Sequence, residues 1–324
     1  MKLTQSLHSI DQIISSFETL MSHLQKLINN NGHTKPIKNT KLGELYNQLL
    51  NINDLPDEAA AALSLPISNY NQVNHLFDES LGISFHEHEI LDLITGQPTL
   101  DGPNDKSSDR LFELSMAIRL ARGSNGKSTI NLATECDIIV DSTLAIECKN
   151  LQSAKKVKPR IKYASEQLER RFAEGLAKCG LIAIDVSALV DRKKVTEFSQ
   201  SIFDSFKESY AVMARNGSMA PIIRNHGVLD SVEMDSNFRK IITSYIAHQA
   251  EFELHSNLGD FRLDHLPQNC WGIIIQSTVP LIISDDQKRV PIPVRTTSYF
   301  LNPSFPEQLE DTIRNFFERL STGF

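Results

Sequence analysis

The amino-acid sequence predicts a mixed α/β fold, in which helices flank a central mixed sheet and an α-helical region comes first. Two observations support this prediction. Residues 1–95 carry apolar side chains at helical spacing and contain no long β-type run. Residues 109–190 then give, in order, a helical pattern, short β-type runs, a second helical pattern and a continuous apolar run. We therefore divide the chain into an N-terminal helical region, 1–100, and an α/β domain, 101–324.

The first thirty residues predict one helix with an apolar stripe along one side. The stripe residues are three and four apart: Leu3, Leu7, Ile10, Ile14, Phe17, Met21, Leu24 and Ile28. The run NNNG ends this helix. A wide stripe suits packing against the helix's own domain, and self-association is the alternative. Residues 41–95 predict further short helices broken by Pro56 and Pro66, and the Gly- and Pro-rich stretch 95–110 predicts a linker.

The elements of the α/β domain follow from its periodicity. Residues 109–122 predict a helix, and the β-type runs after it are TINLAT, DIIV and LAIEC. A second helix is predicted over 163–180, closed by Gly180. The apolar run LIAIDVSAL that follows predicts a central buried strand. The later predicted elements are a long helix, 234–257, and two strands, 270–284 and 290–301.

The composition is typical of a soluble globular chain without a membrane span. Apolar residues make up 40% and charged residues 23%, and no apolar run approaches the length that crosses a bilayer. The N-terminus shows no signal-peptide core, and the four cysteines form no metal-binding spacing. We therefore expect a cytoplasmic protein with reduced thiols. The net charge of −7 argues against non-specific coating of nucleic acid, but it leaves room for a local basic groove.

Two further patterns carry little weight. ARGSNGKS at 121–128 resembles a phosphate-binding loop, but such a loop needs a strand before it and a helix after it, and here the order is reversed. A helix-to-strand turn is the better interpretation. FHEHE at 85–89 offers His86 and His88 as metal ligands, but two histidines without a third ligand are more often surface residues.

The stretch CDIIVDSTLAIECKN, 136–150, places charges where β-branched residues predict buried strands. Because successive strand residues alternate between faces, Glu147 and Lys149 share one face. The link DST predicts a hairpin that can bring Asp137 close to Glu147. Asp141 is the alternative to Asp137 as the first carboxylate of this pair. Two close carboxylates repel each other unless a cation lies between them, and Mg²⁺ prefers such ligands. The pattern fits metal-assisted phosphodiester hydrolysis; the alternative is an exposed charged pair at a sheet edge.

Asp137, a gap of nine residues and then Glu147-Cys148-Lys149 resembles the motif of the PD-(D/E)XK nuclease superfamily, whose members have the restriction-endonuclease-like fold. The resemblance implies that Asp137, Glu147 and the backbone carbonyl of Cys148 hold Mg²⁺, for which Mn²⁺ can substitute. It also implies that Lys149 positions and activates the attacking water. Cys136 stands where the family's name has proline.

Two flanking residues extend the resemblance, which covers residues 109–190 and, less clearly, the sheet out to about residue 300. Glu113 lies on the preceding predicted helix, where the family often has an acidic residue, and it would be a further ligand or a water-orienting group. Gln167 lies on the following predicted helix, where many relatives place a polar residue near the active site.

A basic segment, KKVKPRIK at 155–162, comes directly after the motif, and Arg171 follows on the next helix. We predict that these side chains contact phosphates, because a local positive field is what binds a nucleic-acid backbone. The alternative is a solvated loop. The predicted contacts are Lys155, Lys156, Lys158, Arg160, Lys162 and Arg171.

The functional expectation is a metal-dependent endonuclease of a bacterial restriction or phage-defence type, with DNA favoured over RNA. The N-terminal helix would support a homodimer or hold a partner subunit. Two alternatives come from other classes. One is a catalytically idle relative that binds nucleic acid or a partner protein, and the other is an assembly subunit that recruits a partner enzyme through its first helix.

Overall fold

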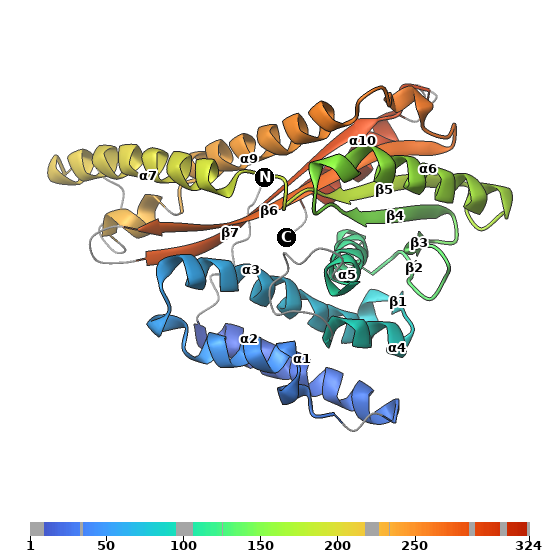
Figure 1. The fold of residues 1–324 in the computed structure, drawn as a ribbon. Coiled ribbons are helices and arrows are strands. Elements are labelled where there is room, and N and C mark those ends of the chain that lie inside the picture. Colours follow the sequence, from blue (N-terminus) through green and yellow to red (C-terminus); the bar gives the residue numbers. More distant parts are fainter. Residues whose placement is uncertain are drawn as a thin grey trace.

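The computed structural model describes residues 10–32, 35–94, 106–124, 126–217, 227–232, 234–284, 289–304 and 310–322. Within these ranges the strands form one seven-stranded mixed sheet with helices on both faces, preceded by an N-terminal helix (Figure 1). The predicted α/β class is thereby confirmed. None of the helices in the described ranges combines the length and the apolar character that a membrane span requires.

The strands lie side by side in chain order. Their bounds are β1 (Ile83–Ser84), β2 (Ile130–Asn131), β3 (Ile138–Val140), β4 (Leu144–Asn150), β5 (Cys179–Asp185), β6 (Cys270–Ser284) and β7 (Arg289–Leu301). β1 is parallel to β2, and β2, β3 and β4 form an antiparallel meander. β4, β5 and β6 are parallel, and β7 pairs antiparallel with β6. β5 has a partner on each side and is covered on both faces, which confirms the prediction from its apolar run.

Three helices cover one face of the sheet (Figure 1). They are α6 (Val157–Ala173), α7 (Arg192–Arg215) and α9 (Ser236–Asn257). Parallel strands need crossover connections: α6 connects β4 to β5, and α7 and α9 lie between β5 and β6. Leu168 of α6, Phe203 of α7 and Ile246 of α9 belong to one buried cluster with Ile182 of β5. This cluster holds the crossover helices on the sheet.

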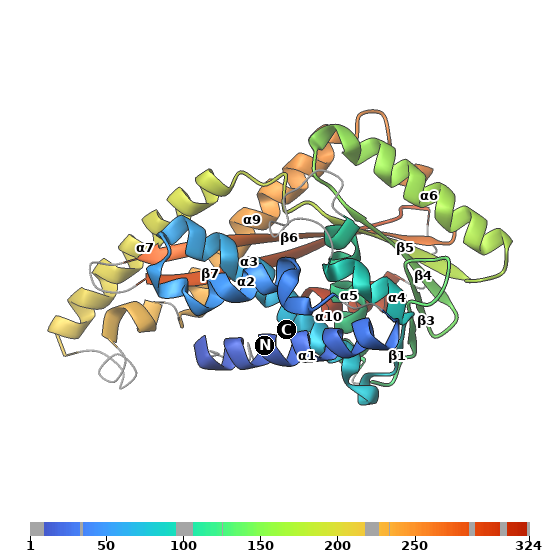
Figure 2. The same ribbon diagram turned by 60° about the horizontal axis from the view of Figure 1, so that its bottom comes forward.

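The opposite face carries the N-terminal helices, α5 and α10. Their bounds are α1 (Ile10–Asn30), α2 (Lys41–Leu50), α3 (Asp57–Val73), α4 (Glu87–Ile90), α5 (Lys106–Gly123) and α10 (Glu310–Thr322). α3 and α5 lie against the sheet, and α1 and α2 lie beyond α3 (Figures 1 and 2). The predicted face of α5, with Leu114, Ala117, Ile118 and Ala121, is buried, and Leu111 is buried as well. A helix that is apolar on several sides in this way belongs in the interior.

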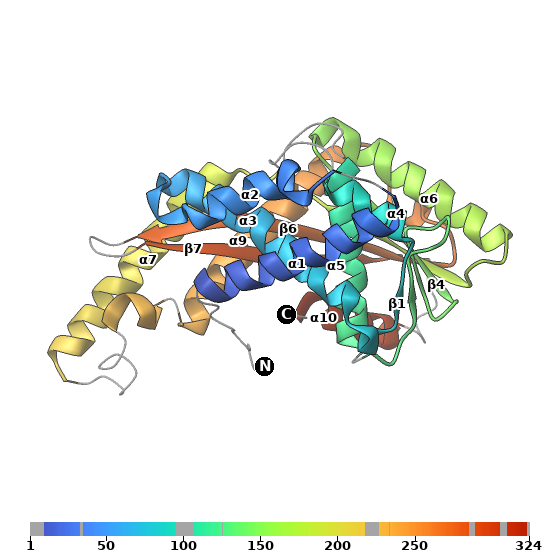
Figure 3. The same ribbon diagram turned by 90° about the horizontal axis from the view of Figure 1, so that it is seen from below.

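The N-terminal helices share a hydrophobic core with the sheet. The stripe of α1 is buried from Phe17 to Ile28, whereas Ile10 at its beginning is exposed. The same cluster continues through α5 to β4, and α1 lies across α3 when the molecule is seen from below (Figure 3). The prediction that α1 packs on its own chain is therefore confirmed. Leu3 and Leu7 lie outside the described residues.

The division at residue 100 also lies outside the described residues, and the two-domain organisation stays a prediction. The predicted linker, 95–110, falls mostly there too, but its last part is wrong, because residues 106–110 begin α5. Within the predicted helical region, β1 pairs with β2 and so contributes to the sheet. The turn after α5 leads into β2, as predicted, although only Ile130 and Asn131 of TINLAT form a strand.

Pro66 does not break a helix, contrary to the prediction. It lies inside α3, whereas Pro56 precedes the first residue of that helix. An interior proline costs about 3 kcal/mol, because its backbone has no donor and its ring crowds the preceding turn. The burial of Leu63, Ile67 and Tyr70, each contributing roughly 1.5–3 kcal/mol, outweighs that cost. Packing against α1 and the sheet thus overrides the local signal.

The helix after the hairpin was predicted too late at both ends. α6 begins at Val157, so the basic segment lies in its first turns rather than in a loop, and Pro159 takes a first-turn position where no amide donor is needed. Gly175, with φ of 72°, follows the helix and donates to the carbonyl of Phe172. Gly180 lies in β5, where a Cβ atom would come within 2.8 Å of Leu168. Close packing explains that glycine.

Candidate active site

The predicted hairpin brings Asp137 and Glu147 together. β3 and β4 are antiparallel, with Ile138 opposite Ile146, so the residues just before and just after this pair face each other. The tight turn uses positive φ values at Asp141 and its neighbour. Asp141 accepts a hydrogen bond from the Thr129 amide at 2.8 Å. Its carboxylate therefore serves the turn, and the structure places Asp137 rather than Asp141 beside Glu147.

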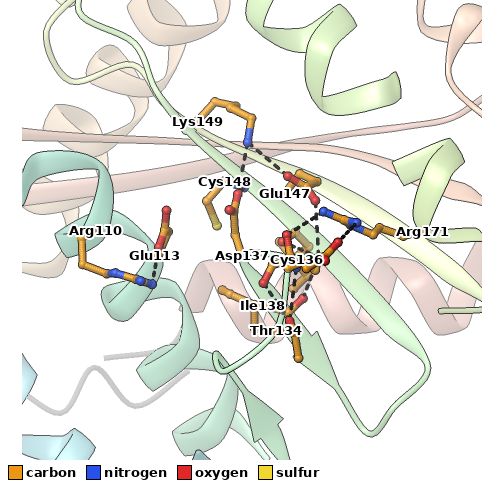
Figure 4. A network of polar contacts seen from close by, with 12 residues as sticks. Arg110, Glu113, Thr134, Cys136, Asp137, Ile138, Glu147, Cys148, Lys149 and Arg171 are labelled. Carbon is orange, nitrogen blue, oxygen red and sulfur yellow. Dashed lines mark hydrogen bonds and ion pairs between the residues drawn. The ribbon is translucent and has the colours of Figure 1, made fainter. Parts of the chain in front are cut away.

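Lys149 joins the two carboxylates (Figure 4). Its Nζ lies 3.1 Å from Oδ2 of Asp137 and 3.2 Å from Oε2 of Glu147. The Cys148 amide donates to the same Oδ2 of Asp137 at 2.7 Å. The Glu147 side chain is fully buried, and those of Lys149 and Asp137 are 9% and 22% exposed. The three charged side chains thus meet in a partly buried site in which Asp137 is the most accessible.

Burial and mutual repulsion control the protonation of this site. Burial and then the neighbouring Asp137 raise the pKa of Glu147, Lys149 opposes both effects, and the net pKa is about 7. For Lys149, burial lowers the pKa, but the two carboxylates outweigh that effect and raise it above its usual value. Lys149 is therefore an ammonium group at neutral pH, whereas Glu147 can exchange a proton.

Glu113 reaches the same site from α5. Burial and then Asp137 raise the pKa of Glu113, the cations Arg110 and Lys149 oppose this, and the net pKa is about 8. In Figure 4, Glu113 lies between Arg110 and the Asp137 side of the hairpin. Arg110 Nη1 donates to Oε2 of Glu113 at 2.7 Å. The structure therefore assembles Glu113, Asp137, Glu147 and Lys149, as the sequence predicted.

Cys136 and Arg171 complete the surroundings of Glu147. The Cys136 Sγ lies 3.4 Å from Oε1 of Glu147 and donates to it, and burial raises the pKa of this thiol. Arg171 of α6 binds Oε2 of Glu135 at 3.0 Å and Oε2 of Glu174 at 3.2 Å. Its other terminal nitrogen donates to the Glu135 carbonyl at 2.7 Å. Arg171 thus ties the start of the hairpin to α6.

The remaining predicted residues form no described contact with the charged side chains of the site. Gln167 is half-buried on α6, and its Oε1 is buried without a hydrogen-bond partner among the described residues. No described contact joins it to Asp137 or Lys149. His86 and His88 stack on each other and contact none of the site's carboxylates in the described structure.

The basic residues differ in what they contact. Lys158 binds Asp260, and Lys162 lies 4.0 Å from Glu166 in an exposed pair. Lys155, Lys156 and Arg160 form no ion pair with any described residue, and they lie at or near the start of α6, shortly after β4. The prediction that Arg171 contacts nucleic acid does not fit the geometry, because its guanidinium is buried and paired with acidic residues.

The donor set fits a hard cation. Glu113, Asp137 and Glu147 supply carboxylate oxygens, and two of them already converge on one cation, the Lys149 ammonium. The Cys148 amide points at Asp137; because the amide and carbonyl of a strand residue point to the same edge, its carbonyl faces that side too. As arranged, no three His, Cys, Asp or Glu side chains in the described ranges surround one point. Mg²⁺ is usually held by one or two carboxylates, with water and substrate oxygens.

Sequence reasoning missed Arg110 and Glu89. Arg110 precedes Glu113 by three residues on α5, and its Nη2 lies 2.7 Å from Oε2 of Glu89 on α4. The helical spacing of Arg110 and Glu113 was a usable signal, because residues three apart meet on one helix face. Nothing local pointed to Glu89, since only folding brings FHEHE to α5.

Comparisons with protein-family models, with curated proteins and with solved structures return no match to this chain.

Proposed function

We propose that the protein is a metal-dependent nuclease with a restriction-endonuclease-like fold, which hydrolyses phosphodiester bonds in DNA. One observation carries this proposal: Lys149 lies between Asp137 and Glu147 at the open end of the hairpin, and Glu113 faces them from α5. This is the residue set that the resemblance to the PD-(D/E)XK nucleases implied. An exposed pair on a sheet edge, the simpler interpretation, does not explain why Glu147 is fully buried.

In the proposed mechanism, Asp137, Glu147 and the Cys148 carbonyl would hold Mg²⁺ or Mn²⁺. The ion, when bound, would supply a more acidic water and neutralise phosphate charge. Lys149, as an ammonium, donates hydrogen bonds to the attacking water or to the phosphate and stabilises the negative charge that develops there. Because Lys149 is protonated, it is not the base. Glu113 would be a further ligand of the ion or would orient the attacking water.

The substrate part of the proposal rests on the local charge. Lys155, Lys156 and Arg160 are separated from Lys149 by only a short link and the start of α6. A cluster of cations next to the cleavage site would hold the backbone phosphates flanking the scissile bond. The preference for DNA, a role in restriction or phage defence, a cytoplasmic location and a homodimer or partner subunit complete the proposal by analogy with the resembled family.

The test is cleavage of supercoiled DNA, linear DNA and RNA with and without Mg²⁺. Glu147→Gln and Lys149→Met are expected to lower the cleavage rate by about 10³-fold, because each removes charge that acts in the transition state. Lys193→Met on α7 is the matched control, since Lys193 forms an exposed pair remote from the site in sequence and on another helix. Cleavage that survives both site substitutions, or no metal-dependent cleavage of any substrate, would contradict the proposal.

A second candidate is a catalytically idle binding module. The observation that favours it is the same ammonium, which satisfies two carboxylates without any added ion. This candidate predicts DNA binding that is unchanged by Mg²⁺ and by Glu147→Gln, and no cleavage. Binding assays run beside the cleavage assay therefore separate the two candidates.

A further inference from the structure

We propose that Arg110 is a positioning residue, which holds Glu113 toward Asp137 and is itself anchored by Glu89 from the N-terminal helical region. This inference rests on the proposed function, because it concerns the same site. It adds two residues that the resemblance does not imply, and it makes α4 part of the active-site architecture.

The contacts of Arg110 are well defined. Nη1 lies 2.7 Å from Oε2 of Glu113, and Nη2 lies 2.7 Å from Oε2 of Glu89. The side chains of Arg110, Glu113 and Glu89 are 15%, 16% and 25% exposed, so water screens the pairs only in part. The contact with Glu113 is a charge-assisted hydrogen bond, which fixes the direction of that carboxylate, whereas the contact with Glu89 is an ion pair without hydrogen-bond geometry and holds the guanidinium by charge. Arg110 therefore bridges α4 and α5.

Glu113 needs such a partner because of what it faces. Its carboxylate is repelled by Asp137, and its surroundings on α5 are apolar. The contact with Arg110 uses Oε2, whereas Oε1 forms no hydrogen bond or ion pair with any described residue. Oε2 is thus held by Arg110, and Oε1 is available to the site. Without Arg110, repulsion by Asp137 would turn the carboxylate away.

Glu89 connects the FHEHE segment to Arg110, whereas the histidines of this segment stack on each other. Glu89 lies on α4 next to Ile90, which is buried in the core shared with α5, so the position of Glu89 is set by packing. Glu87 on the same short helix instead accepts a hydrogen bond from the Asn31 side chain at 3.3 Å. The two glutamates have the same charge and neighbouring positions, but only Glu89 contacts Arg110. Glu87 is therefore a matched control.

The experiment compares wild type with Arg110→Met, Arg110→Lys, Glu89→Gln and Glu87→Gln. The readouts are calorimetric titration with Mn²⁺, the Mg²⁺ concentration for half-maximal cleavage, and the unfolding temperature. Arg110→Met is expected to weaken Mn²⁺ binding about tenfold, as loss of a residue that orients a metal ligand does. Arg110→Lys should recover part of this loss, Glu89→Gln should show a smaller one, and Glu87→Gln should match wild type.

A background with Glu113→Gln tests whether Arg110 acts through Glu113. Adding Arg110→Met to that variant should then weaken Mn²⁺ binding no further, because the ligand that Arg110 positions is already altered. A full additional loss would overturn the inference, and so would an Arg110→Met protein that is folded and binds Mn²⁺ as wild type does. In both cases the proposed function stands if wild type cleaves. A wild type that neither binds metal nor cleaves overturns both proposals.

Discussion

Two buried polar clusters lie beside α5, and they differ in charge and in how their groups are satisfied. The carboxylate cluster consists of Glu89, Glu113, Asp137 and Glu147 with Arg110 and Lys149, so four formal negative charges meet two positive ones. The arginine cluster lies on another side of α5 and contains Arg119, Arg295, Asp185 and Gln276.

The terminal nitrogens of Arg119 are bound within the protein, although Nε of Arg119 and Nε of Arg295 are buried without a hydrogen-bond partner among the described residues. Arg119, which is 2% exposed, donates to Gln276, to the Leu320 carbonyl and, at 3.2 Å, to the Thr297 hydroxyl. These contacts tie α5 to β6, β7 and α10. Burial and then the nearby Arg295 lower the pKa of Arg119 to about 9, against an opposing effect of Asp185. The acceptors here are mainly neutral oxygens, as in a network that fixes packing.

The carboxylate cluster is different because its acids repel one another. The pKa values of Glu113 and Glu147 are raised to about 8 and about 7 mainly by burial and further by repulsion from Asp137, and the cations Arg110 and Lys149 offset these effects only in part. A further cation would relieve this repulsion, whereas in the arginine cluster, where Arg119 and Arg295 outnumber Asp185, a cation would add to the repulsion. We therefore propose that the arginine cluster serves stability and that the carboxylate cluster binds metal, and this separation can be tested.

The largest expected effect is on stability. Arg119→Met should lower the free energy of unfolding by about 3 kcal/mol, because buried acceptors such as Gln276 lose their partner. Chemical denaturation measures this, and Mn²⁺ titration of the folded variant should give the wild-type affinity. Arg262→Met, which removes a 75% exposed guanidinium, is the control. A variant of unchanged stability that lost metal binding would reverse the assignment of the two clusters.

Glu113→Gln is expected to change the free energy of unfolding by a smaller amount, and this change depends on pH. The pKa of Glu113 is raised from 4.5 to about 8 in the folded protein, so the stability that its protonated form contributes is present at pH 4 and is lost as pH rises toward 8 and above. Glutamine stays neutral. The variant should therefore gain stability over wild type between pH 5 and pH 9, by at most about 1.4 kcal/mol for each pH unit.

Thermal unfolding at both pH values, without added metal, measures that gain. Glu58→Gln on α3 is the control, because Glu58 is exposed and its substitution should change nothing with pH. A Glu113→Gln protein that becomes less stable relative to wild type as pH rises would contradict this. It would show that attraction by Arg110 outweighs burial and repulsion by Asp137, so that the negative charge of the carboxylate cluster is compensated.

The smallest expected effect is on the salt dependence of DNA binding, and it concerns the basic residues that follow β4 in the sequence. Lys155→Gln, Lys156→Gln and Arg160→Gln should each lower the slope of log affinity for DNA against log salt by about 0.9, if each contacts one phosphate. Fluorescence anisotropy with labelled duplex DNA measures the slopes. Lys193→Gln on α7 should leave the slope unchanged. Equal slopes for all four variants would remove the phosphate contacts from the proposal.

Local sequence patterns predicted the hairpin and the meeting of its charges, because strand alternation and a short turn act over a few residues. Asp137, Glu147 and Lys149 were found in this way, and Glu113 through the resemblance. The failures involve contacts between distant segments. Pro66 stays helical because α3 packs on α1 and the sheet, and Gly180 allows Leu168 to approach β5.

The links from Arg110 to Glu89 and from Arg171 to Glu135 were missed for the same reason. Each joins two elements that only the folded chain brings together. The buried pairing of Arg171 also shows why composition alone misjudges a basic residue: its partners are acids, Glu174 at the end of the same helix and Glu135 from before β3.

The most direct test of the central claim is calorimetric titration of Mn²⁺ into wild type, Asp137→Asn and Glu147→Gln, at pH 6 and pH 8. Wild type should bind one ion, and more tightly at pH 8, because protons compete for Glu147 and Glu113 at pH 6. Both substitutions should weaken binding at least about tenfold. A wild type that binds no metal, or variants that bind it as well as wild type, would contradict the claim that the carboxylate cluster is a metal site.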